Sequence, residues 1–395
     1  MTAGIAFGVF DHIEHLPGVP LDQLYRERLL QMEALDQAGF YAYHLAEHHT
    51  PAVHSMAPSQ NVFLAAASQR TRQLRFGPGV YVLPLHHPLR LIEEVSMLDN
   101  LSDGRLEIGV GRGGVLEAYF WGQESDEDTN QARYDEHLAI LLEGLSHDLL
   151  SFDGSFWKFE EVPMRLAPKQ RPYPPLWYMR NPETAAQGGM NCIIVGGLDT
   201  LEANVVRYRR LWDHFNGEGS LTRQGTVPKI GLVVHIVVAD SDEEAVAIAR
   251  PAFDAYRWNL GTPRRLEAER RKLVQFLGSP GNGTARTYTS PERHTAAAER
   301  RDLDQALAQL SEQEREQRSA RRRLPGEIAG GVMAGSPESV CRFMEEYVTT
   351  GANYLLCSFQ WGNISHSQAM RSVELWGTDV LPKFAAAGAN DRAGV

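Results

Sequence analysis

Cysteine is scarce in this chain of 395 residues, which contains only Cys192, Cys341 and Cys357, far apart and outside any CxxC pair. This scattered, odd-numbered set predicts no disulfide framework and fits a reducing compartment. Long apolar runs are also missing, because no stretch approaches the ~18 residues of a membrane span. The first residues, MTAGIAFGVF, lack the basic start and apolar centre of a signal peptide. We therefore expect a soluble, cytoplasmic protein.

Positive charge is in deficit, with 39 Lys and Arg against 50 Asp and Glu, a net charge of −11 and a pI near 5.7. This balance disfavours non-specific binding to nucleic acid or to anionic membranes. The hydrophobic fraction of 43% is sufficient for a large core. The length exceeds the usual ~100–200 residues of one domain, but barrels of alternating strands and helices often exceed it too. We expect one domain over residues 1–395.

Short β-type runs alternate with helical segments along most of the chain. The β-type runs lie at 5–10, 41–46, 74–83, 105–111, 176–179, 191–196, 229–240 and 353–359. The helical segments lie at 21–39, 59–69, 87–104, 132–145, 184–188, 201–215 and 367–384. A small hairpin is expected at 151–159, with Asp153 and Gly154 as its turn. About eight strand–helix units predict an α/β fold, a closed parallel (β/α)8 TIM barrel.

One segment breaks this alternation. Residues 264–325 are rich in Arg, Glu, Gln and Ala and include the Gly- and Pro-containing stretch GSPGNGTARTYTSP at 278–291. One interpretation is a solvated helical insertion with a disordered tip. The other is a lid, because insertions after barrel strands border the active site. The sequence leaves both open.

The stretch FYAYHLAEHHTP, from Phe40 to Pro51, places His44, Glu47, His48 and His49 within six positions. A shared metal is disfavoured because the segment is typical of a strand, where residues four apart lie about 13 Å from each other. The histidines could instead satisfy loop hydrogen bonds. A third interpretation is an acid–base group for catalysis, since the ordinary pKa of histidine lies near neutrality.

Several ordered motifs resemble a known family. They are LAEHH, then LRFGPGVYVLPLHHPLRLIEEVSMLDNLSDGRLEIGVGRGG, with further similarity at SPESV and in the last strand and helix. Together they resemble the bacterial luciferase-like flavin-dependent monooxygenases over most of residues 4–197. A series of motifs at consistent spacing is far more specific than any single glycine motif.

The resemblance implies a usually dimeric (β/α)8 barrel that uses reduced FMN and O2 to oxygenate a small organic substrate through a flavin C4a-hydroperoxide. A separate NAD(P)H:flavin reductase normally supplies the reduced FMN. The first histidine after the glutamate lies beside the flavin in this family, which implies a catalytic role for His48. Glu47 or His49 would then orient it, as supporting hydrogen-bond partners do.

The resemblance also implies a phosphate site. In GVGRGG, Arg112 matches the arginine that binds the FMN phosphate, a role suited to a forked guanidinium. The glycines alone would also explain a tight turn after the strand. Bacterial luciferase has a reactive cysteine just before this arginine, where this chain has Gly111, so flavin effects that depend on it do not transfer.

LWYMRNPETAAQGG is the second candidate for contacts to FMN. Met179, Asn181 and Thr184 lie between a strand and an expected helix start, where free N–H groups favour an anion. The family has Glu-Ser-x-x-Thr here, so Thr184 matches while Arg180 and Asn181 differ. An ordinary helix N-cap is the alternative.

Two further predictions concern the flavin ring and the substrate. The family often has a non-prolyl cis peptide beneath the ring, and it matches Gly79–Val80 in GPGVYVLP. Tyr81 is then either a flavin contact or a core aromatic. Phe10, His12, Tyr119, Trp121 and Trp361 fall where strand ends and loops are expected, either as an apolar pocket or as simple packing.

Three rival functions stay open. An F420-dependent oxidoreductase of the same fold would transfer hydride without O2, although the glutamate of EHH favours FMN. A non-catalytic flavin-binding partner subunit is disfavoured by the presence of both His48 and Arg112. A zinc hydrolase is the least supported, and the site is expected to hold no metal.

Overall fold

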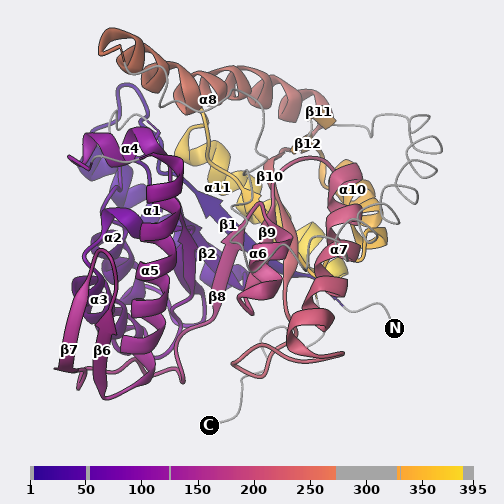
Figure 1. Cartoon of the computed structure of the whole chain (residues 1–395). Helices are drawn as coiled ribbons and strands as arrows, with labels where there is room; N and C mark the ends of the chain where they lie inside the picture. Colours follow the sequence, from indigo (N-terminus) through magenta and orange to yellow (C-terminus); the bar gives the residue numbers. More distant parts are fainter. Residues whose placement is uncertain (1–3, 50–53, 124–125, 273–326, 330, 386–395) are drawn as a thin grey trace.

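The computed structural model describes residues 4–49, 54–123, 126–272, 327–329 and 331–385, with backbone only at 327–329. A parallel sheet curls through its centre with helices around it (Figure 1). Its strands are β1 (Ala6–Asp11), β2 (Ala42–Leu45), β3 (Arg75–Pro78), β4 (Tyr81–Val82), β5 (Ile108–Gly111), β8 (Leu176–Met179), β9 (Asn191–Ile194), β10 (Ile230–Val238) and β13 (Tyr354–Ser358). The short antiparallel hairpin β6 (Leu149–Asp153) and β7 (Lys158–Pro163) lies apart from the sheet.

The strand order closes the sheet into a barrel. Neighbouring strands follow the path β3-β2-β1-β13-β10-β9-β8-β5-β4, and the pairings along it are parallel. Because β3 and β4 are two parts of one extended segment, the path returns to its start, and a bridge between Phe76 and Leu106 joins the remaining edges. The nine strand names therefore make eight barrel positions, and the predicted TIM barrel is confirmed.

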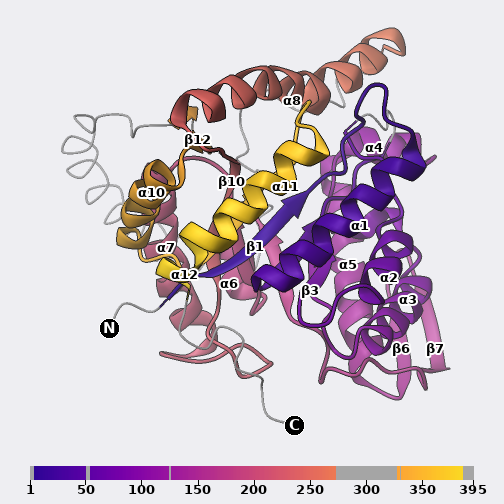
Figure 2. The same ribbon diagram turned by 180° about the vertical axis from the view of Figure 1, so that it is seen from behind.

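Helices cover the outside of the barrel (Figures 1 and 2). They are α1 (Leu21–Ala38), α2 (Gln60–Ser68), the 3-10 turn η1 (Leu83–Leu85), α3 (Pro88–Leu101), α4 (Val115–Phe120), α5 (Glu127–Ser146), α6 (Pro182–Gln187), α7 (Leu198–Asn216), α8 (Asp242–Arg270), α10 (Pro337–Thr349), α11 (His366–Leu375), the π-helical turn η4 (Trp376–Val380) and α12 (Leu381–Phe384). Beside β10 the sheet is extended by β12 (Val332–Gly335), which pairs with β11 (Glu327–Ala329). Among the described helices, none combines the length and the apolar character that crossing a membrane requires.

Local sequence signals explain several element ends. Helix α1 ends at Gly39, which has a φ of 84° that suits glycine. The predicted hairpin forms, but its connection is longer than the expected Asp153–Gly154 turn, because Asp153 still pairs with Lys158. The carboxylate of Glu136 on α5 accepts hydrogen bonds from the backbone N–H groups of the connecting residues at 2.7–3.2 Å, which fixes the wider turn.

The helix before the last strands continues further than the sequence predicts. Residues 264–270, assigned to the insertion, form the last turns of α8, which passes through Pro251 and Pro263 without ending. Most of the predicted insertion and its stretch at 278–291 lie outside the described residues. The choice between a solvated insertion and a lid therefore stays a prediction for that part.

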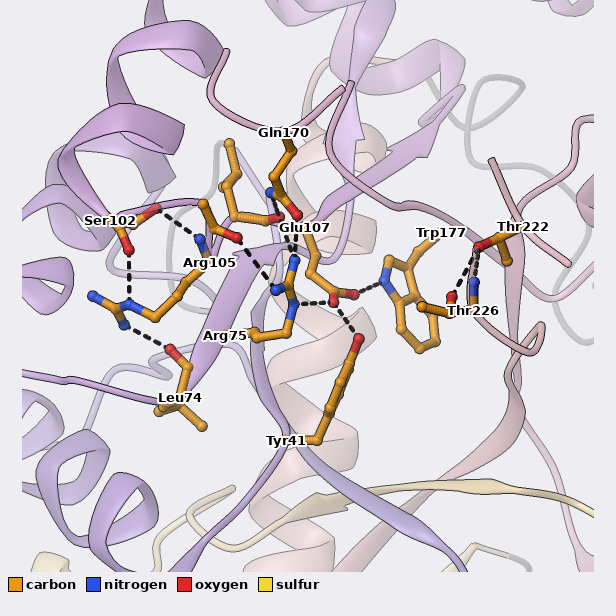
Figure 3. Close-up of polar contacts among 12 residues, drawn as sticks. Tyr41, Leu74, Arg75, Ser102, Arg105, Glu107, Gln170, Trp177, Thr222 and Thr226 are labelled. Carbon is orange, nitrogen blue, oxygen red and sulfur yellow. Dashed lines mark hydrogen bonds and ion pairs between the residues drawn. The ribbon is translucent and has the colours of Figure 1, made fainter. Parts of the chain in front are cut away.

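A buried carboxylate organises the amino-terminal end of the barrel. Glu107, fully buried just before β5, accepts hydrogen bonds from Arg75 Nε at 2.5 Å, from the Tyr41 hydroxyl at 2.5 Å and from the Trp177 indole (Figure 3). Burial alone would raise the pKa of Glu107, but the Arg75 and Lys229 charges outweigh it and lower the pKa. The charge of Glu107 thus ties together four barrel segments.

Large side chains fill the barrel above this carboxylate. Tyr354 of β13 reaches across the interior, and its hydroxyl is hydrogen-bonded to His44 Nε2 at 2.8 Å. This is possible because Gly8 has no side chain, since a Cβ there would lie 1.9 Å from the Tyr354 hydroxyl oxygen. The centre of the barrel is a packed core, so ligands can bind only at its ends.

Helix α8 lies across the end of the barrel to which β1 points (Figure 2). Asn259 of α8 donates to the Glu14 carboxylate at 2.7 Å, and the same carboxylate accepts from the Gly362 N–H at 3.1 Å. Glu14 follows β1 and Gly362 follows β13, so α8 is fastened to two strand ends. The carboxyl ends of the strands are therefore covered by α8.

Candidate active site

His44 and His48 have different surroundings, although only four residues separate them. The His44 ring lies inside the barrel, edge-on to Trp177 with ring centroids 4.9 Å apart and hydrogen-bonded to Tyr354. Burial lowers the pKa of His44 to about 4. His48 lies beyond the end of β2 and contacts neither of these aromatic residues in the described contacts. His44 therefore belongs to the core and His48 to the barrel mouth.

Glu47 is a buried anchor for the turn after β2. Its carboxylate lies 2.7 Å from His49 Nε2 and 3.0 Å from His86 Nε2, and it accepts the Val82 N–H at 3.0 Å. Burial alone would raise the pKa of Glu47, but the charges and hydrogen bonds of His86 and His49 lower it to about 2. The ionised Glu47 thus fixes His49 and the backbone of β4 in place.

The direct neighbour of His48 is Glu117 of α4. His48 Nδ1 lies 3.7 Å from Glu117 Oε1, and the other carboxylate oxygen accepts the Gly114 N–H at 3.1 Å. Arg264 of α8 lies 3.7 Å from the same carboxylate. The sequence favoured Glu47 or His49 as the group that orients His48. In the structure that position is held by Glu117, since Glu47 is bonded to His49, His86 and Val82.

Three imidazoles meet at the barrel mouth. His12 follows β1, and its ring centroid lies 4.0 Å from that of His54. The ring centroid of His48 lies 5.4 Å from that of His12 and 4.9 Å from that of His54. Burial, with the neighbouring histidines, lowers the pKa of His12 well below its usual value and that of His54 to about 2. These two rings are therefore neutral at physiological pH.

Aromatic and polar groups surround these imidazoles on the α8 side. The His235 ring of β10 lies 4.3 Å from Tyr256 of α8 and 5.1 Å from Trp361. Phe10 packs edge-on against His12 at 4.8 Å. Tyr119 and Trp121 are each 43% exposed, and the Trp121 ring lies 4.1 Å from that of His49. The expected apolar set thus divides, and the part near His48 is rich in imidazole.

The peptide bond between Gly79 and Val80 is cis, as the resemblance implies. It joins β3 to β4, and Gln60 Nε2 donates to the Val80 carbonyl at 3.2 Å. A Cβ at Gly79 would lie 3.0 Å from His44 Cβ, so this backbone rests directly on the core. The Tyr81 side chain is buried and donates to Asn61, which favours the core interpretation for that ring.

Arg112 follows β5 at the same end of the barrel. Its guanidinium pairs with the carboxylate of Glu127 and donates to the Glu127 carbonyl at 3.2 Å. Burial raises the pKa of Tyr178 on β8, and the positive charge of Arg112 opposes that rise. Gly111 permits close packing, because a Cβ there would lie 2.5 Å from a Val80 methyl carbon.

The turn after β8 uses Asn181 as a helix cap. Its side-chain oxygen accepts the N–H groups of Glu183 at 3.0 Å and Thr184 at 3.2 Å at the start of α6. Met179, half-buried, ends β8 just before this turn. The Asn181 side chain is thereby engaged within the turn as a helix N-cap, the alternative role that the sequence left open for it.

Glu117 and His54 are site residues that sequence reasoning missed. A weak signal existed for Glu117, because a carboxylate three residues after an N-cap commonly bonds back to the cap N–H. Here the cap is Gly114, which hides the usual serine or threonine pattern. No local pattern marks His54, since only the closed barrel brings it to His12 and His48.

Comparison with known proteins agrees with this geometry. The family model described as luciferase-like monooxygenase matches residues 5–354. An uncharacterized protein, y4wF, of Sinorhizobium fredii is 44% identical over 265 residues, 65% of this chain and 74% of its own length. The oxygenase component of the flavin-dependent trigonelline monooxygenase of Acinetobacter baylyi is 29% identical over 248 residues, 62% of this chain and 68% of its own.

A solved structure shares the barrel over nearly its whole length. It is the oxygenating constituent of 3,6-diketocamphane monooxygenase from Pseudomonas putida, in complex with FMN, with a TM-score of 0.67 and 17% identity. The two cover 96% of this chain and 99% of the other. At 17% identity the similarity to this structure establishes only the fold. Membership of the family is established by the family model that matches residues 5–354. The chain is an oxidoreductase that belongs to the luciferase-like monooxygenase family.

Proposed function

We propose that this protein is the oxygenase of a two-component, FMN-dependent monooxygenase. Reduced FMN, when bound, supplies the electrons that activate O2 for insertion into a small organic substrate. The observation that carries the proposal is the position of His48, which lies at the barrel mouth between Glu117 and two neutral imidazoles. The relative from Acinetobacter, named as an oxygenase component, supports a separate flavin reductase as partner. A homodimer in the cytoplasm completes the proposal.

The residues at the mouth fit a flavin. The backbone at Gly79 rests on His44, since a Cβ there would lie 3.0 Å from His44 Cβ, and it offers a surface against which a planar ring can lie. Arg112 supplies a permanent positive charge after β5 for the phosphate, and the Thr184 hydroxyl adds a hydrogen bond from α6. Binding phosphate would require Arg112 to exchange its exposed partner Glu127, whose side chain is 63% exposed, for the ligand.

The proposed roles of the remaining residues follow from their contacts. His48 exchanges a proton with the reacting oxygen, and Glu117 holds the ring through its Nδ1 side. Glu47 acts indirectly by fixing His49 and the β4 backbone. Met179 ends β8 and Tyr81 lies in β4, and both act on the cofactor indirectly, by fixing these strand ends beside it. Helix α8 limits the access of water to this end of the barrel.

The first experiment is rapid mixing of protein, loaded with reduced FMN without oxygen, with oxygenated buffer. We expect a transient near-ultraviolet absorbance that differs from oxidised FMN and lasts longer than with free FMN. His48→Ala should shorten or abolish it, while the exposed control His147→Gln should not change it. Reoxidation as fast as that of free FMN, without a transient, would refute the proposal.

An F420-dependent oxidoreductase is the alternative, because solved F420-dependent enzymes share this barrel. It would transfer hydride and need no O2. Separate titrations with FMN and F420, followed by cofactor absorbance, distinguish the two. Saturable binding of F420 with no binding of FMN would favour the alternative. Binding of FMN without any productive oxidation would favour a non-catalytic partner subunit.

A further inference from the structure

His12, His48 and His54 form a compact group of ligand atoms. One ring nitrogen from each lies within 4.8 Å of the others. The three residues come from separate parts of the mouth, after β1, after β2 and before α2. From the sequence, a shared metal was weighed only for His44 and His48. In the structure His44 lies inside the barrel and His48 lies at its mouth. The three-histidine group is thus a different arrangement from the one that strand geometry disfavoured.

The nitrogens of His54 lack partners. His54 is only 5% exposed. Both of its ring nitrogens are buried, and neither forms a hydrogen bond with another described residue. Buried polar side-chain atoms in folded proteins are nearly always hydrogen-bonded. A neutral imidazole has one lone-pair nitrogen, so His54 can offer one of its two partnerless nitrogens, beside one nitrogen each from His12 and His48, to a ligand that accepts lone pairs. A metal ion is such a ligand.

We propose that His12, His48 and His54 bind a divalent transition-metal ion such as Zn2+ or Co2+, with the fourth coordination position open. Three histidines and an open position form a common zinc arrangement. Bonds of 2.0–2.1 Å would bring the nitrogens to about 3.4 Å from one another, a small closure of the observed group. Because the ligands are imidazoles, Zn2+, Co2+, Ni2+ and Cu2+ are favoured over Mg2+ and Ca2+.

Glu117 gives the site a supporting carboxylate. It lies on the Nδ1 side of His48, which leaves Nε2 to face the ion. Carboxylates that orient a metal-binding histidine in this way also make the ring a better ligand. The same His48 is the proton-exchanging group of the proposed oxygenase. Metal binding would occupy its free nitrogen, so the ion would inhibit that reaction.

The test is a titration of metal-free, flavin-free full-length protein with Co2+, followed by visible absorbance. We expect one Co2+ per chain, visible bands typical of a four-coordinate ion and displacement by Zn2+. His54→Gln and His12→Gln should each weaken binding by about 10–100-fold. The exposed control His147→Gln should bind as the unaltered protein does.

Thermal unfolding provides a second readout that needs no activity. Zn2+ should raise the unfolding midpoint of the unaltered protein, because a ligand that binds only the folded state stabilises it. The shift should be absent in His54→Gln, provided that this variant unfolds cooperatively. No saturable site, or equal binding by His54→Gln, overturns the metal proposal and leaves the flavin proposal untouched. Inhibition of the oxygen-dependent transient by Zn2+ then tests whether the two functions share His48.

Discussion

His48 Nδ1 lies 3.7 Å from Glu117 Oε1, and this pair connects the turn after β2 with the first turn of α4. Because Glu117 is 6% exposed and also contacts Arg264, its carboxylate is held in a fixed position. The ring of His48 is therefore oriented by a residue 69 positions away in the chain (117 − 48). The proton exchange proposed for His48 would therefore depend on that distant carboxylate.

Glu117→Gln is expected to shorten the oxygen-dependent transient about tenfold, because it removes the negative charge that faces His48 Nδ1 at 3.7 Å. FMN affinity should stay within about twofold, since Glu117 positions His48 and is not proposed to touch the phosphate. Rapid mixing and equilibrium titration measure the two quantities. Glu93→Gln, at a side chain that is 53% exposed, is the control. An unchanged transient in Glu117→Gln would rule out the positioning role.

Arg112→Ala is expected to weaken FMN binding about 10–100-fold, because it removes a charge-assisted contact to phosphate. Riboflavin, which has the same ring without phosphate, should bind both proteins about equally. Flavin fluorescence measures both affinities. Arg90→Ala removes a charge from a side chain that is 71% exposed and should change neither. Equal loss for FMN and riboflavin would indicate damage to the fold and would count against a phosphate role.

Glu107→Gln is expected to lower the free energy of unfolding by about 1–3 kcal/mol, because the half-buried charges of Arg75 and Lys229 would lose their carboxylate partner. Urea unfolding followed by tryptophan fluorescence measures this change. Glu93→Gln again serves as the exposed control, with an expected change within about 0.5 kcal/mol. A loss below about 1 kcal/mol would show that the network of Figure 3 contributes little to stability.

His44 should make the fold sensitive to acid. Its pKa falls from 6.5 to about 4 on folding, so the unfolded chain binds the proton more readily. The neutral form of buried His44 therefore contributes to the free energy of unfolding. This contribution is complete above pH 6.5 and is lost as the pH falls from 6.5 through 4. Between about pH 7.5 and 4.5 the loss is roughly 2.5 kcal/mol.

His44→Gln should therefore show a smaller decrease in unfolding free energy over that pH range. Urea unfolding at both pH values measures the difference, and each protein is compared with itself. His147→Gln, at an exposed position, should keep the full decrease. If His44→Gln and the unaltered protein lose the same free energy, His44 does not titrate as its burial requires.

The parts of the fold that sequence predicts are those fixed by local chemistry. LWYM coincides with β8, and Gly39 ends α1 with a positive φ. Alternation of strands and helices gave the barrel because parallel strands need helical crossovers. The longer hairpin connection could not be predicted, since it depends on Glu136 from another element.

The residues of the candidate site also divide into those that a local sequence motif indicates and those that only the folded chain brings together. Motif resemblance pointed to the cis bond Gly79–Val80, which the structure contains, and to His48 and Arg112 as site residues, which stays a prediction. It could not locate Glu117 or His54, because the contacts of these residues arise only when the barrel closes and α4 folds over its mouth. Glu47 was predicted to orient His48, but its carboxylate contacts His49 and His86, so a supporting role in catalysis stays a prediction.

The ring of Tyr354 limits the depth of the barrel. Its hydroxyl lies where a side chain at position 8 would be, and Gly79 rests on His44, so these described residues fill the barrel interior at that level. In the proposed oxygenase, the shape of the substrate would then be recognised by the loops and by α8. Such loops can change by insertion or substitution without disturbing the strands. The same barrel can then acquire a new substrate while its strands and packed core stay unchanged.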